Sequence, residues 1–200
     1  MINSNRLFIK EVHAATLTFW KSFRLPWCKA WIDSSPAGRH LAGKLMDEEF
    51  KELLSSSTPE QKLDAYCDLL YVTAGAMHAL GYDHNYLNGI DETPNFTGPL
   101  AEAIRLIQEP GIVCHRRLQN ASPSAMLGIT ETAEHHFPKF RNAFRAVHSA
   151  NMSKLWKTPS KDDMHINENI GPNLWLVKHR DTGKVMKSPE FKHPNLAKYI

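Results

Sequence analysis

The stretch MDEEFKELL, residues 46–54, carries four carboxylates within two helical turns, and Lys51 is the only cation among them. On a helix, Glu48, Glu49 and Glu52 share one side because residues three and four positions apart are neighbours. Crowded like charges oppose folding unless water or a cation compensates them. The stretch is therefore either a solvated helix face or one wall of a site for something positive.

A second pair of acids, Asp64 and Asp68, is spaced i,i+4 and also shares one helix side. Asp68 lies in AYCDLLYVTAGAM, where nearly every neighbour is apolar. Burying an unpaired carboxylate is very costly, and residues 63–104 contain no Lys or Arg. A cation held between the two groups of acids would satisfy both. Hard divalent cations take oxygen ligands of this kind.

The first group of acids requires a helix that begins near Ser35. Ser35 is a suitable N-cap, and Pro36 suits the first helical position, where its missing N–H costs nothing. The pattern predicts that this helix continues to about Leu54.

The second helix is predicted to begin at Pro59, after Thr58 as N-cap, and Gln61 completes a capping-box pattern. It becomes almost wholly apolar after Asp64, as expected of a helix central to its domain, and ends at Gly81. Because the linking loop is short, the two helices should pack antiparallel and bring their acids to the same level. Carboxylates on facing helices are a recurring design for divalent cations.

The remaining elements surround this pair. Apolar spacing predicts a helix over about 6–23, and PLAEAIRLIQE predicts a short helix that ends before Pro110. The rest of 82–136 has no clear pattern. Regular spacing returns in FPKFRNAFRAVHSANMSKLW, residues 137–156. In the last forty residues, LWLVKH and KVMKS predict a β-hairpin with the turn at 181–183.

The predicted fold is therefore all-α, a four-helix-bundle-like core with a small C-terminal β-hairpin. Residues 1–156 would form the helical domain, with an insertion at about 82–136, and residues 157–200 a hairpin and tail packed on the same domain.

Composition narrows the function. The formal net charge of +3 over 200 residues is too small to indicate nucleic-acid binding. Three cysteines without CxxC spacing argue for a reducing compartment, and no apolar run reaches 18 residues. We therefore expect a soluble, cytoplasmic protein with neither a membrane nor a nucleic-acid partner.

Basic residues late in the chain are candidates for binding an anion. Asn151 and Lys154 continue the apolar stripe of the preceding helix and should point inward, where a lysine needs an anion such as a phosphate. The alternative for Lys154 is a cap at the helix C-terminus. Lys184 and Lys187 are further candidates for closing over phosphates, and the alternative for both is a solvated strand face.

Aromatic and histidine residues have more ordinary explanations. Phe19, Trp20 and Tyr71 could sandwich a base, but core packing is the simpler explanation for each. His78 and His148 stand in apolar surroundings typical of hydrogen-bonded core histidines.

EEFKE followed by DAYCDLLYVTAGAMHALG resembles the all-α nucleoside triphosphate pyrophosphohydrolases, the superfamily of MazG, phosphoribosyl-ATP pyrophosphohydrolase and dimeric dUTPase. Its signature is EExxE on one helix and ExxD on the next, which hold Mg²⁺ on the triphosphate. Asp64 matches the final acid, but Gln61 occupies the place of the preceding Glu. Either Gln61 is a neutral oxygen ligand, or Glu60 or Asp68 compensates.

The resemblance extends to other parts of the chain. VHAATLTFWKSFRLP is similar to the opening helix of MazG-like proteins that are common in phages. AFRAVHSANMSKLW followed by GKVMKSPEF resembles their C-terminal helix and hairpin.

The resemblance implies Mg²⁺-dependent hydrolysis of a (deoxy)nucleoside triphosphate to the monophosphate and pyrophosphate, with Mn²⁺ as a substitute metal. The expected metal-binding and catalytic residues are Glu49, Glu52 and Asp64, then Glu48 and Asp68. The expected phosphate-binding residues are Asn151, Lys154, Lys184 and Lys187.

Two alternatives stay open: a phosphoribosyl-ATP pyrophosphohydrolase, and a catalytically inactive helical module that binds a nucleotide or a partner. The resemblance further implies a homodimer or homotetramer, located in the host cytoplasm if a phage encodes the protein.

Overall fold

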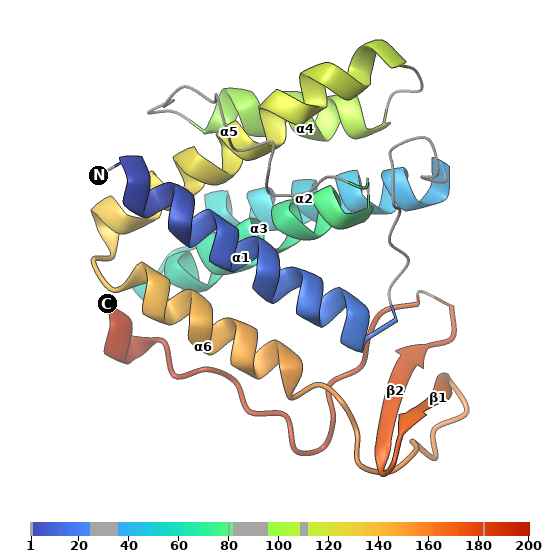
Figure 1. The fold of residues 1–200 in the computed structure, drawn as a ribbon. Helices are drawn as coiled ribbons and strands as arrows, with labels where there is room; N and C mark the ends of the chain where they lie inside the picture. The colour runs from blue at the N-terminus through green and yellow to red at the C-terminus, as the bar shows by residue number, and fades with distance from the viewer. Residues whose placement is uncertain (1, 25–35, 80, 82–95, 109–111, 182) are drawn as a thin grey trace.

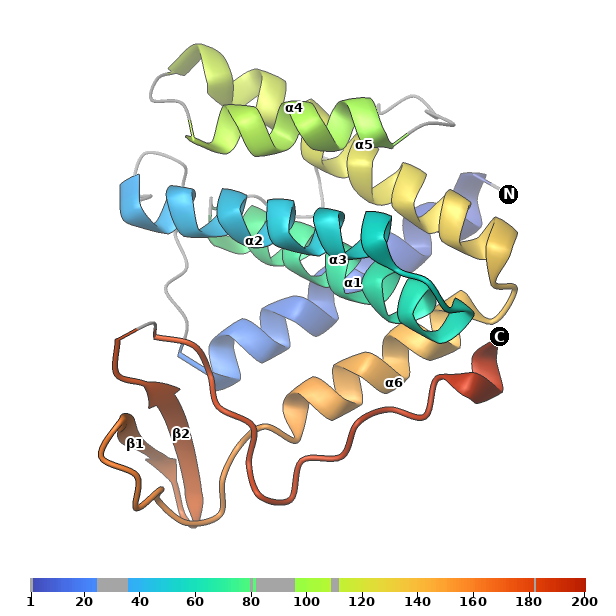
Figure 2. The ribbon, with the colours of Figure 1, turned by 180° about the vertical axis from the view of Figure 1, so that it is seen from behind.

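The structure, a computed structural model, describes residues 2–24, 36–79, 81, 96–108, 112–181 and 183–200. Within these ranges the chain forms six α-helices, one two-stranded sheet and a short 3-10 helix (Figures 1 and 2). The elements are α1 (Ile2–Ser22), α2 (Pro36–Ser55), α3 (Pro59–Ala79), α4 (Thr97–Gln108), α5 (Ile112–His136), α6 (Phe140–Met152), β1 (His165–Gly171), β2 (Leu174–His179) and η3 (Ala197–Tyr199).

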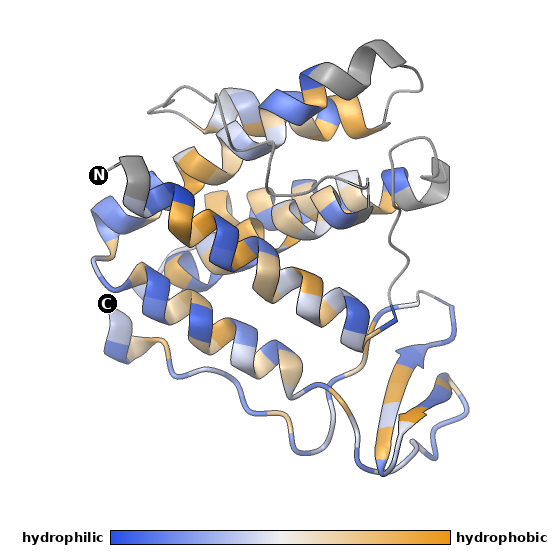
Figure 3. Ribbon diagram, viewed as in Figure 1, coloured by the Kyte–Doolittle hydropathy of each residue, from blue (hydrophilic) through white to orange (hydrophobic). Residues whose placement is uncertain are grey.

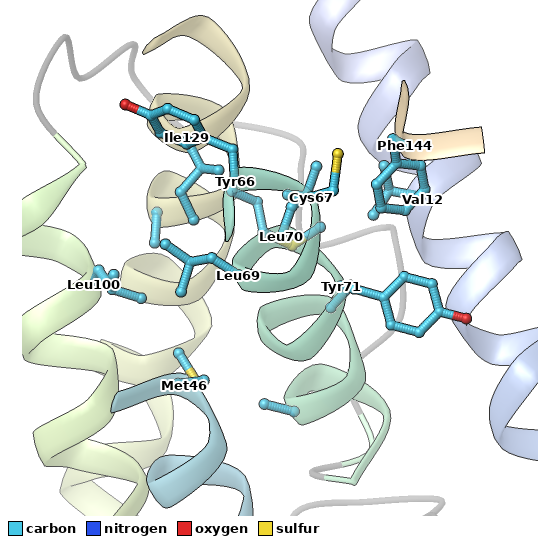
Figure 4. Close-up of a cluster of buried hydrophobic side chains, with 14 of the residues drawn as sticks. Val12, Met46, Tyr66, Cys67, Leu69, Leu70, Tyr71, Leu100, Ile129 and Phe144 are labelled. Atoms are coloured by element: carbon cyan, nitrogen blue, oxygen red, sulfur yellow. The ribbon is translucent and has the colours of Figure 1, made fainter. Parts of the chain in front are cut away.

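Helix α3 is the centre of the core and packs against α1, α2, α5 and α6. Figure 4 shows its side chains pointing in opposite directions, with Leu69 toward α4 and Tyr71 toward α1. The Tyr71 ring lies 5.9 Å from that of Phe144 on α6. Each apolar side chain buried in this way contributes roughly 1.5–3 kcal/mol to folding. α3 is therefore apolar on all its sides because other helices pack against all its sides.

The predicted helices are confirmed with small changes of boundary. α1 starts four residues earlier than expected, and α2, α3, α4 and α6 occur where the apolar spacing and the prolines placed them. Figure 3 shows hydrophilic and hydrophobic residues alternating along α1 and α6, as expected of helices with one buried side. The Ser35 cap and the bounding Pro110 lie outside the described residues. The helical fold with a small C-terminal hairpin is confirmed, and the four-helix-bundle description stays a prediction.

The segment without a clear pattern contains α5, a 25-residue helix with Pro123 in its interior. α5 packs against α4, and the two helices lie against α2 and α3 (Figures 1 and 2). Contact is close at Gly128, where an added Cβ would lie 2.7 Å from the Cβ of Phe96. A glycine is thus required at Gly128 for α5 to approach the start of α4.

The predicted hairpin is partly wrong. LWLVKH is a strand, β2, but its partner is β1, which precedes it, and the turn between them contains Asn173 with φ 52°. The expected partner, KVMKS, pairs with β2 only through a single bridge, between Lys178 and Val185. A turn does occur where expected, since the N–H of Gly183 donates to the carbonyl of His179 at 2.9 Å. The polar composition of HINENIG concealed β1.

None of the helices in the described part of the chain has the length and apolar character needed to cross a bilayer.

Candidate functional site

Helices α2 and α3 bring the predicted acids together. They are joined by residues 56–58 and pack along one another, so the end of α2 lies beside the start of α3 (Figure 2). The carboxylates of Glu49, Glu52, Asp64 and Asp68 lie close enough to act on one another electrostatically. We call these four residues the acid cluster.

Glu49 is the member of the cluster on α2 that points into the structure. Burial raises the pKa of its carboxyl to about 7, and the charges of Glu52, Glu48 and Asp64 add to the shift. Lys184 lowers this pKa, but by less than each of these acids raises it. Because a shift of one pKa unit corresponds to about 1.4 kcal/mol, the charged form of Glu49 is strongly disfavoured. At Glu49, the repulsion from neighbouring acids thus outweighs the attraction of Lys184.

Asp68 shows the same imbalance. Burial raises the pKa of its carboxyl to about 7, and Asp64 and Glu49 raise it further. Lys154, which no sequence pattern placed beside Asp68, lies close enough to lower this pKa. Lys154 lowers the pKa of Asp68 by less than either Asp64 or Glu49 raises it. A cationic partner from a distant part of the chain therefore exists, yet it leaves the repulsion uncompensated.

Asp64 connects the acids to the C-terminal segment. Burial and the neighbouring Glu52 raise the pKa of its carboxyl, whereas His193 and Lys187 lower it. A hollow of about 310 Å³ adjoins Asp64 and is lined by the start of α3 and by residues 194–197. His193 was not among the predicted site residues. No spacing pattern signals it, because only the path of the chain after β2 brings it to Asp64.

Lys154 follows the end of α6 and points inward as predicted. Its side chain is partly buried, with Nζ 5.9 Å from the centroid of the Phe19 ring. Burial lowers the pKa of its ammonium group, while Asp68 raises it and Lys187 and Lys184 lower it. Four basic side chains, those of Lys154, Lys184, Lys187 and His193, thus face the acid cluster. Asn151, the other predicted residue of this helix, is buried.

The outer side of α2 is a solvated face. Asp47 forms an exposed ion pair with Lys51 at 2.5 Å, and Glu48 forms one with Lys44 at 3.6 Å. Such pairs contribute little to stability. The run of acids is therefore divided: Asp47 and Glu48 face water, and Glu49 faces the acids of α3.

Gln61 caps α3. Its Oε1 accepts hydrogen bonds from the N–H groups of Ser57 and Thr58 at 3.1 and 3.2 Å and from the Ser57 hydroxyl at 2.9 Å. In return, the N–H of Gln61 donates to Thr58 Oγ1 at 3.2 Å. The predicted capping box is confirmed. Asp68 lies among the other acids of the cluster, and the choice between Gln61, Glu60 and Asp68 as the further ligand stays a prediction.

The carboxylates do not form a finished metal site. Within the described ranges, no three His, Cys, Asp or Glu side chains are grouped so that they could hold a metal ion. The metal-binding roles predicted for these acids stay predictions.

The aromatic and histidine residues are part of the core, as the simpler explanation proposed. Phe19 and Tyr71 are buried, with ring centroids 5.5 Å apart. His78 is 3% exposed, and its Nε2 lies 2.9 Å from the Thr16 hydroxyl. The Tyr71 hydroxyl lies 3.1 Å from Nδ1 of His148.

Comparison with known proteins adds one finding. Residues 26–88 match the family model of phosphoribosyl-ATP pyrophosphohydrolase, and this range includes α2, α3 and all four residues of the acid cluster. No curated protein and no solved structure matches the chain. The resemblance seen in the sequence is thus confirmed: residues 26–88 are similar to the phosphoribosyl-ATP pyrophosphohydrolases, within the all-α nucleoside triphosphate pyrophosphohydrolase superfamily.

Proposed function

We propose that the protein is a nucleoside triphosphate pyrophosphohydrolase that hydrolyses a (deoxy)nucleoside triphosphate to the monophosphate and pyrophosphate with Mg²⁺ or Mn²⁺. The observation that carries the proposal is the acid cluster, in which Glu49 and Asp68 repel their neighbours although lysines stand beside them. Carboxylates gathered from two facing helices, with lysines opposite them, suit a polyphosphate that carries a divalent cation.

The donor set fits a hard divalent cation. All four side chains of the acid cluster offer carboxylate oxygens, which Mg²⁺ and Mn²⁺ prefer to sulfur or imidazole ligands. Glu49, Glu52, Asp64 and Asp68 would hold the metal, with Glu48 at the edge of the cluster. When bound, the metal would neutralise charge on the phosphates and on the transition state.

The basic residues would bind the phosphates. The inward position of Lys154 and its burial suit a charged hydrogen bond to a phosphate oxygen. Lys184 and Lys187 approach the acids from the C-terminal segment. Asn151, buried one turn before Lys154, would supply an amide donor. A triphosphate would thus lie between carboxylates on one side and ammonium groups on the other.

A carboxylate of the cluster would orient the attacking water and accept its proton. The water oxygen would form a bond to phosphorus as the anhydride between the α- and β-phosphates breaks. The bridging oxygen would leave with the β-phosphorus as part of pyrophosphate, whose negative charge the lysines would offset.

A panel of nucleoside and deoxynucleoside triphosphates, with Mg²⁺ or Mn²⁺ and with pyrophosphate detection, tests the proposal. We expect equal amounts of monophosphate and pyrophosphate and no reaction in EDTA. Orthophosphate and a diphosphate as first products would overturn the proposed cleavage position.

Phosphoribosyl-ATP is the second candidate substrate because the matching family model bears its name. The same panel should include it, since both substrates release pyrophosphate. Preference for phosphoribosyl-ATP over every free triphosphate would establish this alternative. Binding of nucleotides without turnover would instead identify an inactive module.

We also retain the proposal of a homodimer or homotetramer, and of a cytoplasmic protein. Exposed Leu41 and Leu45 on α2 are surface apolar residues that a second subunit could cover. Light scattering across a range of protein concentrations measures the oligomeric state directly.

A further inference from the structure

The segment that follows β2 runs along α6 toward the start of α3 (Figures 1 and 2). It is attached at both ends. Near its start, the Ser188 hydroxyl donates to the carbonyl of Ser153 at 3.0 Å, just beyond α6. Near its end, Leu196 is buried, and Lys139 Nζ donates to the carbonyl of Lys198 at 3.1 Å. Residues 189–195 are thus held in place beside the acid cluster.

Three side chains, one just before the first attachment and two between the attachments, form one unit. Nζ of Lys187 lies 4.8 Å from the centroid of the Phe191 ring and 3.4 Å from Nε2 of His193. The Phe191 and His193 rings meet edge to face, with centroids 4.9 Å apart at an interplanar angle of 84°. Cation–π and edge-to-face contacts each favour a fixed geometry. Phe191 therefore holds two basic groups in a defined relation to each other.

The unit faces Asp64. Lys187 and His193 both act electrostatically on the Asp64 carboxylate, which is half-buried at the start of α3. Two basic side chains beside a carboxylate have two explanations. Either they neutralise the acid, or they bind an anion that is also bound by a metal ion held on that acid. The first explanation does not account for Phe191, since two exposed basic groups need no aromatic ring packed against them to screen one carboxylate.

We propose that His193 is a further phosphate-binding residue and that Phe191 is a positioning residue, which holds the His193 imidazole and the Lys187 ammonium group over the phosphate site. The ligand class is a polyphosphate with its divalent cation. The proposal rests on the proposed function for the identity of the substrate. It adds a recognition element that lies outside the segment matched by the family model.

Binding of inorganic pyrophosphate in the presence of Mn²⁺, measured by titration calorimetry, tests the unit without turnover. His193→Ala should weaken binding by about tenfold, the effect of one charged hydrogen bond. Phe191→Leu should weaken it by about threefold or more through lost cation–π and ring contacts, and Phe191→Tyr should restore it. Lys192→Ala is the matched control, because it removes a charge from the same segment at an exposed side chain.

Kinetics on the best nucleotide supply a second measurement. The two variants should raise KM and leave kcat nearly unchanged, as expected when a binding contact present in both ground and transition states is lost. Wild-type affinity in both variants would overturn the proposal. So would an equal loss in Lys192→Ala, or failure of the wild-type protein to bind pyrophosphate. Loss of pyrophosphate affinity in the two variants supports the proposal even if no nucleotide is hydrolysed, a result that overturns the proposed function alone.

Discussion

Thr58 and Gln61 exchange hydrogen bonds at the start of α3, each side chain accepting from the other residue's backbone N–H at 3.2 Å. Gln61 Oε1 accepts from Ser57 as well, so it receives three donors in all. An amide oxygen with two lone pairs has no further capacity for a metal ion. We therefore expect the residue in the place of the expected glutamate to stabilise a helix and not to bind a cation.

Gln61→Ala should therefore lower stability and leave metal binding intact. Loss of one half of a capping box costs about 0.5–2 kcal/mol, and Thr58→Ala should cost a similar amount. Urea unfolding gives the stability, and melting curves with and without Mn²⁺ give the metal response. Disappearance of the Mn²⁺ response in Gln61→Ala alone would return Gln61 to the metal site.

Glu49→Gln should raise the melting temperature of the metal-free protein at pH 8, or at least not lower it. The pKa of Glu49, about 7 in the folded protein, lies above its ordinary value of 4.5. The charged form therefore destabilises the fold, an effect that begins above pH 4.5 and is complete above about pH 7. The difference from wild type should shrink at pH 5.

The same variant should lose most of the stabilisation by Mn²⁺, because binding to the folded state alone stabilises it by mass action. Hydrolysis should fall by about 10² or more. Asp47→Asn is the matched control, since it removes an exposed carboxylate from the same helix. A Glu49→Gln protein as active and as metal-responsive as this control would show that the acids merely face water. Glu52→Gln should behave like Glu49→Gln if both residues bind the metal.

Lys154→Ala should weaken substrate binding or turnover by at least about tenfold, since charged hydrogen bonds contribute ~1.5–3 kcal/mol. Thermal stability should change little. The lost attraction to Asp68 is offset by relief from burial and from repulsion by Lys187 and Lys184. Lys157→Ala, which removes an exposed lysine paired with Glu190, serves as the control. Kinetics identical to wild type would leave Lys154 as a helix cap.

His78 should make the protein sensitive to acid. Burial lowers the pKa of its imidazole to about 3, with a further contribution from His13, whose ring centroid is 4.1 Å away. A lowered pKa means that the neutral form stabilises the fold. This stability is complete above pH 6.5 and is lost as the pH falls toward 3, by up to about 1.4 kcal/mol per pH unit.

Urea unfolding between pH 4 and 7 measures this effect. His78→Gln should show a shallower dependence on pH than wild type, whereas His136→Gln, at an exposed position, should follow the wild type. The acid cluster titrates in the same range in both proteins, so its contribution cancels in the comparison. Parallel curves for all three proteins would contradict the prediction.

Local chemistry explains what the sequence predicted well. The Thr58–Pro59–Gln61 pattern set the start of α3, because a capping box is satisfied by residues three positions apart. The i,i+4 spacing of Asp64 and Asp68 placed both acids on one side of that helix. These features depend on neighbours within one turn and therefore do not require knowledge of the fold.

Longer-range features were missed for physical reasons. α5 continues through Pro123, because tertiary packing against α3 and α4 outweighs one lost hydrogen bond, and no local pattern in 82–136 indicated this helix. β1 is largely polar and is a strand only through its pairing with β2. The approach of Lys154 to Asp68 and of His193 to Asp64 depends on the path of the chain across the whole domain. No local pattern encodes such contacts.

The acids of the acid cluster and the basic residues that face it lie in different parts of the chain. They are therefore synthesised at different times during translation. The acid cluster lies on α2 and α3, whereas Lys184, Lys187 and His193 come after β2. A nascent chain on the ribosome thus displays carboxylates that repel a triphosphate long before the ammonium groups that attract one are made. Affinity for the anion should therefore arise only late in synthesis, after the helices have emerged.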